Sequence, residues 1–332
     1  MLNGLSTTGY RLEIKINFPK LFNLAKPPSL KRSLLLCRPY RSSSFLPSVG
    51  ELADAISREK HICIRSLDPA PVFQHLALEE WILSFLEEAV DLNNEYRVLL
   101  FYVNKPCVVI GRNQLIWNEC DPSIITTARR MSGGGAVYHD PGNLNFSLFT
   151  PKHLFRRERG IEALRTSLQA EIPASLLRTS TFHDLFLSEK KVSGSAFRIA
   201  RGCAYHHGTA LFCSDLQMLS KALKPKEFPD FFISSMGASK SRRSFVANIN
   251  DHYPNLKVAS IIDGMAKFLG ILICLQFCAR YPKLSFNWSQ FCVASRLEVY
   301  ENPAHATGMN KHCLMWLSSL LNGSSAIIPN LA

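Results

Sequence analysis

Residues 129–149 read RRMSGGGAVYHDPGNLNFSLF, with two arginines leading into three consecutive glycines. Glycine adopts positive φ without cost and lets a ligand approach the backbone, so the N–H groups of such a triplet can converge on an anion. The arginines add fixed positive charge and forked donors. Apolar runs at 136–138 and 146–149 predict buried strands directly after the glycines. We therefore expect an ordered anion-binding loop, although three glycines alone would indicate a flexible surface linker.

Three other stretches place small residues beside polar or charged ones. They are VVIGRNQ at 108–114, KVSGSA at 191–196 and YHHGT at 205–209. The glycine triplet at 133–135 is not a Walker loop, because no Gly-Lys-Ser/Thr follows it. It is not a dinucleotide-binding fingerprint either, because its glycines are spaced differently. In this order, the four blocks resemble the signature of the lipoate-protein ligase A and mitochondrial lipoyltransferase family, whose loop reads RRxSGGGxVxHDxGN. The resemblance covers about residues 62–256.

The resemblance implies a fold and an activity. The fold is α+β, the biotin/lipoate ligase (class II synthetase-like) catalytic domain with a mixed, largely antiparallel sheet and flanking helices. The activity is transfer of a lipoyl or octanoyl group from lipoyl-adenylate (lipoyl-AMP) to a specific lysine of an acceptor. The acceptors it implies are the lipoyl domains of 2-oxoacid dehydrogenase acyltransferase subunits and the glycine-cleavage H protein.

Two versions of this activity stay open at the sequence level. Full ligases of the family make the adenylate from lipoate and ATP with Mg²⁺, whereas animal-type transferases use a preformed adenylate or an acyl-protein donor. Ahead of the KVSGSA block the family commonly has Arg or Asn before Asp-Leu, but here Phe182-His183 precede Asp184-Leu185. This departure favours transfer without efficient activation.

Lys191 is the predicted catalytic residue. Acyl transfer from an adenylate needs fixed positive charge where the carbonyl and phosphate oxygens gain negative charge, and Lys191 matches the family lysine with that role. A lone lysine is usually a solvated surface group, as Lys190 is expected to be, but the small-residue turn at 193–195 lets a ligand approach the strand closely. The residues predicted to bind the adenylate are Arg130, Gly133, Gly134, Gly135, Ala136, Val137, Tyr138, Lys191 and Thr209.

The adjacent histidines and Cys203 are not predicted to take part in the chemistry. His206 and His207 are adjacent on a predicted strand and so point to opposite faces, and no metal site is predicted. Cys203 occupies the connector between two blocks without a recognised base partner, which favours a bystander. An octanoyltransferase that uses Cys203 is still a rival interpretation, as is a non-catalytic protein that binds lipoyl-adenylate or lipoyl domains. A biotin ligase is disfavoured because its Gly-Arg-Gly-Arg-type loop is absent.

The net charge of +12 is concentrated near the start of the chain. Residues 1–50 contain eight Lys or Arg and one acid, which is +7 of the total. The remainder gives little support to a nucleic-acid partner. Residues 1–45 are also rich in Ser and Leu, which is typical of a transit peptide and, with the resemblance, predicts the mitochondrial matrix. A disordered basic tail is the alternative.

The rest of the chain predicts a sizeable α+β domain. Strands are expected at 63–64, 98–102 and 107–110, the last two forming a hairpin around 104–106, and further strands run through 196 and 211. Helices are expected at 73–86 and 161–177. The predicted catalytic domain is 55–257, and 258–332 is an unrecognised, diverged or incomplete accessory region. The apolar run at 268–275 is too short to span a membrane, and ten scattered cysteines without a Cys-x-x-Cys pair predict reduced thiols.

Overall fold

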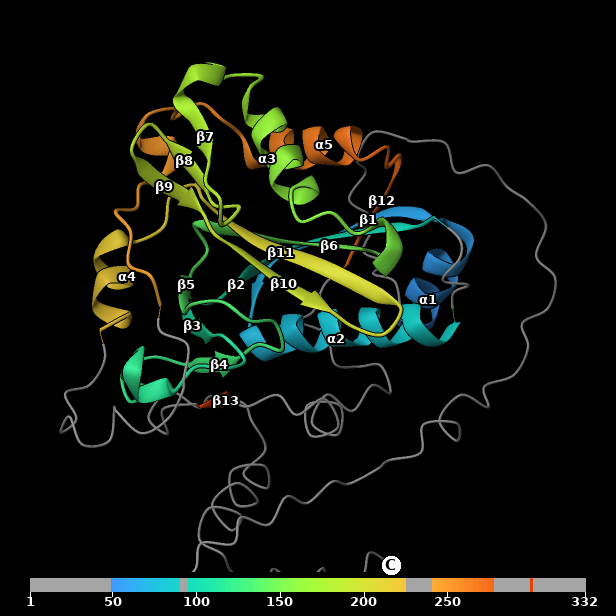
Figure 1. Cartoon of the computed structure of the whole chain (residues 1–332), viewed down its shortest axis with the longest axis horizontal. Coiled ribbons are helices and arrows are strands. Elements are labelled where there is room, and N and C mark those ends of the chain that lie inside the picture. Colours follow the sequence, from blue (N-terminus) through green and yellow to red (C-terminus); the bar gives the residue numbers. More distant parts are fainter. Residues whose placement is uncertain (1–48, 90–94, 225–240, 278–298, 301–332) are drawn as a thin grey trace, which may run out of the picture. The chain divides into compact units, whose positions relative to one another are not determined.

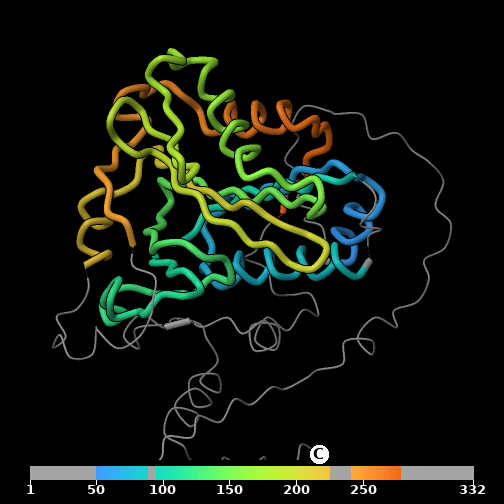
Figure 2. Tube along the Cα trace, viewed as in Figure 1, coloured from blue at the N-terminus to red at the C-terminus, as the bar shows by residue number. Residues whose placement is uncertain are grey.

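The computed structural model describes residues 49–89, 95–224, 241–277 and 299–300 (Figures 1 and 2). Its largest element is a six-stranded sheet of strand order β10-β11-β6-β2-β1-β12. These strands are β10 (Ser195–Ile199), β11 (Cys203–Leu211), β6 (Asn143–Pro151), β2 (Arg97–Asn104), β1 (His61–Ala70) and β12 (Ile273–Gln276). The predicted transit peptide, 1–45, lies outside the described residues, as does most of the predicted accessory region.

Helices cover both faces of this sheet (Figure 1). One face carries α1 (Val49–Arg58) and α2 (Val72–Ala89), and the other carries α3 (Arg159–Leu168) and α5 (Val258–Phe268). The alternation of β2 shows why both faces are buried. Leu99 and Phe101 join the core under α3 and α5, whereas Leu100 and Tyr102 join the core against α1 and α2. Burial of each such large apolar side chain stabilises the fold by about 1.5–3 kcal/mol.

Two smaller sheets complete the structure. The four-stranded sheet has the order β13-β4-β3-β5, and the three-stranded sheet has the order β7-β8-β9. Their strands are β13 (Val299–Tyr300), β4 (Thr127–Arg129), β3 (Cys107–Ile110), β5 (Val137–His139), β7 (Leu177–Thr179), β8 (Leu185–Leu187) and β9 (Lys190–Ser193). A short helix, α4 (Leu216–Ala222), follows β11. Most strand pairs are antiparallel, and β1 pairs in parallel with both β2 and β12. This confirms the predicted α+β class with mixed, largely antiparallel sheets.

Two predicted elements are wrong. The strands predicted at 98–102 and 107–110 do not form a hairpin, because β2 pairs with β1 and β6 while β3 pairs with β4 and β5. The buried Asn104 side chain bonds His75 and His139, which holds the chain where it crosses between sheets. The helix predicted at 161–177 ends at Leu168. Pro173 lies inside the predicted range, and because it has no N–H and restricts the residue before it, a helix could not have continued to 177.

The described chain continues past the predicted boundary at residue 257. α5 shares a hydrophobic core with α3, and β12 extends the six-stranded sheet at the β1 edge. The division into domains stays a prediction. In the described part of the chain no helix is both long enough and apolar enough to cross a bilayer.

Candidate active site

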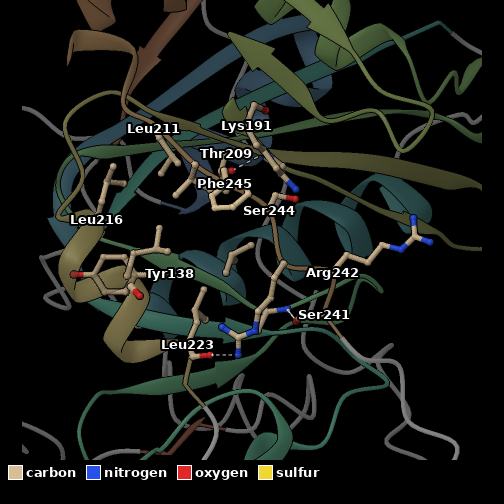
Figure 3. Close-up of a pocket in the computed structure, with 18 of the residues that line it drawn as sticks. Tyr138, Lys191, Thr209, Leu211, Leu216, Leu223, Ser241, Arg242, Ser244 and Phe245 are labelled. Atoms are coloured by element: carbon tan, nitrogen blue, oxygen red, sulfur yellow. Dashed lines mark hydrogen bonds between the residues drawn. The ribbon is translucent and has the colours of Figure 1, made fainter. Parts of the chain in front are cut away.

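A cavity of about 390 Å³ opens beside the glycine loop (Figure 3). Its walls come from the start of β5, from β9 and the turn after it, from the end of β11, from α4 and from residues 241–246. Figure 3 shows Lys191 and Thr209 on one side of the space and Tyr138 and Ser241 on the other. The volume lies within the range of small-molecule sites.

Arg130 holds the glycine loop in place through hydrogen bonds to its backbone. Arg130 is 2% exposed, and its guanidinium donates to the carbonyl oxygens of Gly133 at 2.6 Å, Gly135 at 2.8 Å and Val109 at 3.1 Å. Desolvation lowers the pKa of Arg130 to about 10, so it stays protonated at neutral pH. Arg130 therefore lies behind the loop and fixes its path.

Two glycines are needed for this close packing. Gly134 has φ of +91°, a left-handed conformation that favours glycine. A Cβ on Gly111 would lie 2.1 Å from the Gly134 carbonyl oxygen, so the block at 108–114 needs glycine where it touches the loop. Two of the four blocks thus form one structural unit.

Ser241 connects this unit to the segment that forms another wall of the cavity. Its hydroxyl oxygen accepts the Ala136 N–H at 2.7 Å and the Gln114 side-chain amide at 3.1 Å. Its own N–H donates to the carboxylate of Glu119 at 3.2 Å. Residues 245–247 then run beside β9, with the Lys191 N–H donating to the Phe245 carbonyl at 2.8 Å. The segment 241–247 therefore joins the glycine loop to β9.

Lys191 presents its ammonium to the cavity wall. Its Nζ donates to the Asp184 carboxylate at 2.7 Å, and both side chains are about one-fifth exposed. The other Asp184 oxygen accepts the Ser195 N–H at 3.2 Å. A Cβ on Gly194 would lie 3.6 Å from Lys191 Nζ and 3.5 Å from the Thr209 hydroxyl, so glycine keeps the space between these groups open. The Lys191 ammonium is therefore held in a fixed position in the wall of the cavity.

The two histidines point to opposite faces of β11, which confirms the prediction. His206 Nε2 lies 2.8 Å from the Ser195 hydroxyl, whereas His207 Nδ1 lies 3.3 Å from the Glu79 carboxylate on α2. Because Ser195 donates its only hydroxyl hydrogen to the His183 carbonyl, His206 Nε2 is the donor to Ser195. Burial lowers the pKa of His206 to about 3, so its ring is neutral. In the described residues, no group of three or more His, Cys, Asp or Glu side chains is arranged to hold a metal ion.

Cys203 lies away from the cavity. It is fully buried in the core against α1 and α2, and desolvation raises the pKa of its thiol to about 12. A thiol with so little thiolate at neutral pH is a poor nucleophile.

The structure brings together five of the nine predicted binding residues. Ala136, Val137, Tyr138, Lys191 and Thr209 line the cavity. Arg130 and the three glycines support the loop behind it. Sequence reasoning missed Asp184 as the partner of Lys191, and it missed the walls formed by α4 and 241–246. The adjacent residues Arg242 and Arg243 could have indicated the 241–246 wall from the sequence. In the structure Arg242 stacks on Phe182, with its guanidinium carbon 4.3 Å from the ring centre.

Comparison with known proteins decides the family. Residues 71–270 match the lipoyl protein ligase A/B catalytic domain. The chain belongs to this family. The chain is 37% identical to human mitochondrial lipoyl amidotransferase LIPT1, over 59% of its own length and 52% of that protein. It is 35% identical to lipoate-protein ligase A of Bdellovibrio bacteriovorus, over 58% and 56%. The chain thus spans about half the length of these curated relatives.

Solved lipoate ligases share the fold. The P. falciparum LipL1 structure in complex with lipoate superposes with a TM-score of 0.54 at 22% identity, covering 65% of each chain. A bipartite ligase of Thermoplasma acidophilum gives a TM-score of 0.50 at 28% identity, covering 71% of this chain and 91% of that one. The four sequence blocks that indicated the lipoate ligase family therefore lie on the fold that the resemblance implied.

Proposed function

We propose that this member of the lipoate ligase family is a lipoyltransferase. It transfers a lipoyl or octanoyl group from lipoyl-adenylate to one lysine of an acceptor lipoyl domain. The observation that carries the proposal is the Lys191 ammonium, held 2.7 Å from Asp184 in the wall of a cavity that also contains the loop residues 136–138. The family's four blocks meet at or directly behind this cavity.

The residues present fit an acyl-adenylate. The apolar side chains of Leu211, Leu216 and Leu219 can accommodate an acyl chain, while Lys191 and Thr209 supply polar groups. The acceptor lysine amine attacks the acyl carbonyl and an amide bond forms. The bond from the acyl carbon to the phosphate oxygen breaks, AMP leaves, and the nitrogen loses one proton to solvent. In our proposal Lys191 stabilises the oxyanion at the carbonyl and the charge on the departing phosphate.

Relatives of the chain support the proposed partners and compartment. LIPT1 is named as a mitochondrial lipoyl amidotransferase, and the Thermoplasma ligase was solved as part of a system with its E2 lipoyl domain. We propose that the chain acts in the mitochondrial matrix on the lipoyl domains of 2-oxoacid dehydrogenase acyltransferase subunits and on the glycine-cleavage H protein. The basic segment at 1–45 supports this location as a transit peptide.

Activation of free lipoate with ATP and Mg²⁺ is the second candidate activity. It is favoured by the match to ligases such as that of Bdellovibrio. The family commonly has Arg or Asn ahead of Asp-Leu, but this chain has His183 there. His183 has a positive φ, packs against Phe197 and does not line the cavity. We therefore favour transfer from a preformed adenylate.

The test supplies full-length protein and apo lipoyl domain with either synthetic lipoyl-adenylate or lipoate plus ATP and Mg²⁺, and reads the acceptor by mass. A lipoyl mass gain only from the adenylate supports the transferase. A gain from both supports a full ligase. Tight adenylate binding with no gain from either would refute the transferase proposal in favour of a binding protein.

A further inference from the structure

Two cysteines lie side by side at the edge of the six-stranded sheet, and neither lines the cavity. Cys63 of β1 is paired in register with Cys274 of β12, and the two strands are parallel. Residues in register on neighbouring strands point to the same face, with backbones about 4.8 Å apart. That separation lies within the Cα range of roughly 4.4–6.8 Å that a disulfide accepts. The fold therefore places two free cysteines at a backbone separation that a disulfide accepts.

The two sulfurs differ in exposure. Cys63 is fully buried in the core beneath α3 and α5, whereas Cys274 is exposed on the edge strand. Reagents in solution therefore reach Cys274 first. Cys63 can react only with a group that is already at its side, which is the arrangement of an attacking and a resolving thiol.

A fixed cation faces Cys274. Arg65 lies two residues after Cys63 on the same face of β1, and its Nη2 is 3.3 Å from the Cys274 sulfur and 2.5 Å from Asp263 on α5. Its Nε is buried without a hydrogen-bond partner. The hydrogen bond from the Cys63 thiol and the charge of Arg65 lower the pKa of Cys274, although partial burial and Asp263 oppose this effect. The pKa of Cys63 is raised. Positive charge beside an accessible sulfur stabilises its thiolate.

We propose that Cys274 and Cys63 form a reversible oxidative modification site whose substrate is a hydroperoxide. The Cys274 thiolate attacks one peroxide oxygen, the O–O bond breaks, and hydroxide or alkoxide leaves, so Cys274 becomes a sulfenic acid. The Cys63 sulfur then attacks the Cys274 sulfur, the S–O bond breaks, and the departing oxygen leaves as water with the Cys63 proton. Two electrons pass from the two thiols to the peroxide, and a disulfide joins β12 to β1.

The disulfide would anchor the last described strand of the sheet. Among the strands that the structure describes, β12 pairs only with β1, so a covalent link between the two strands limits fraying at this edge. Because neither cysteine contacts the cavity, this site is independent of the proposed acyl transfer. A reducing thiol would reverse the modification.

The test treats the full-length protein with limiting hydrogen peroxide, blocks free thiols at low pH and maps peptides by mass spectrometry. We expect a Cys63–Cys274 linked peptide that dithiothreitol releases. In Cys63→Ser we expect Cys274 to accumulate as a sulfenic acid that dimedone traps. Cys213, which is also exposed, serves as the internal control and should react more slowly with peroxide. Equal rates at Cys213 and Cys274, or linkage of Cys274 to another cysteine, would overturn the proposal.

A pair of variants separates the role of the Arg65 charge from its structural role. Arg65→Gln removes the cation beside Cys274, whereas Asp263→Asn removes only the ion pair with Arg65. We expect Arg65→Gln to slow alkylation of Cys274 by about tenfold at about pH 5, because below the Cys274 pKa of about 6 a one-unit rise in pKa lowers the thiolate fraction about tenfold. Asp263→Asn should leave the rate unchanged or raise it. Equal slowing in both variants would mean that the reactivity depends on local packing and would contradict the proposed thiolate.

Discussion

At the scale of single residues, the Lys191–Asp184 pair is the feature on which the proposed chemistry depends. We predict that Asp184→Asn lowers the rate of lipoyl transfer by about tenfold to a hundredfold, because an ammonium without its carboxylate partner loses its alignment with the reacting carbonyl. The measurement is single-turnover transfer from lipoyl-adenylate, with Glu189→Gln on the exposed turn before β9 as the matched control. An unchanged rate in Asp184→Asn would show that Asp184 does not position Lys191.

Substitution of Gly194 is expected to affect ligand binding, whereas substitution of Gly208 is expected to affect stability. A Cβ on Gly194 would make ordinary contacts near Lys191 and Thr209, so we predict that Gly194→Ala folds normally but raises the KM for lipoyl-adenylate. A Cβ on Gly208 would lie 2.4 Å from the Phe146 ring, so Gly208→Ala should destabilise the protein by about 1–3 kcal/mol. Urea unfolding and steady-state kinetics on both variants check this. A stability loss in Gly194→Ala as large as that in Gly208→Ala would count against the assignment of Gly194 to the site.

At the scale of elements, the segment 241–247 connects the glycine loop to β9. We predict that Ser241→Ala weakens adenylate binding while the free energy of unfolding falls by only about 0.5–1.5 kcal/mol per lost hydrogen bond. Ser244→Ala is the control, since Ser244 lines the same cavity and is exposed. Isothermal titration with a non-hydrolysable adenylate analogue gives the affinity. Equal affinities for the two variants would contradict this role for Ser241.

Local patterns predicted the elements better than their pairing. Continuous apolar runs correctly indicated β2, β3, β5 and β6, because these strands are buried along nearly their whole length. The hairpin between β2 and β3 was wrong because the buried contacts of Asn104 with residues 29 and 35 positions away decide the crossing, and no local pattern encodes them. The helix after 168 was predicted too long because the apolar spacing continues up to Pro173 and past it.

The site was predictable to a similar extent. The glycine triplet and the small-residue turn are local signals, and they indicated residues 136–138 and Lys191 in the cavity wall. Asp184 could not be identified as the partner of Lys191, because their contact depends on the irregular pairing of β8 with β9. The sequence also could not show that Arg130 lies behind the loop and donates its hydrogen bonds to backbone carbonyl oxygens.

At the scale of the whole molecule, buried neutral histidines predict sensitivity to acid. Burial lowers the pKa of His75 to about 4 and those of His139 and His206 to about 3, compared with about 6.5 in the unfolded chain. Below pH 6.5 the unfolded state therefore binds more protons than the folded state, so stability falls as the pH decreases. We predict a decrease in the free energy of unfolding between pH 6.5 and 5 of up to about 1.4 kcal/mol per pH unit for each histidine.

Urea unfolding at pH 7, 6 and 5 measures this dependence. His206→Gln, which removes one buried imidazole beside Ser195, should show a smaller decrease over the same interval. A free energy of unfolding that stays constant from pH 7 to 5 would be incompatible with three neutral buried imidazoles.

The central claim is that Lys191 in this cavity carries acyl transfer. The most direct measurement compares Lys191→Ala with Lys190→Ala, two neighbouring lysines on β9 of which only Lys191 lines the cavity. Full-length protein, lipoyl-adenylate and apo lipoyl domain are mixed, and the acceptor mass is followed over a single turnover. We predict that Lys191→Ala slows transfer by about a hundredfold to a thousandfold, while Lys190→Ala keeps the wild-type rate. Equal rates in the two variants would contradict the account.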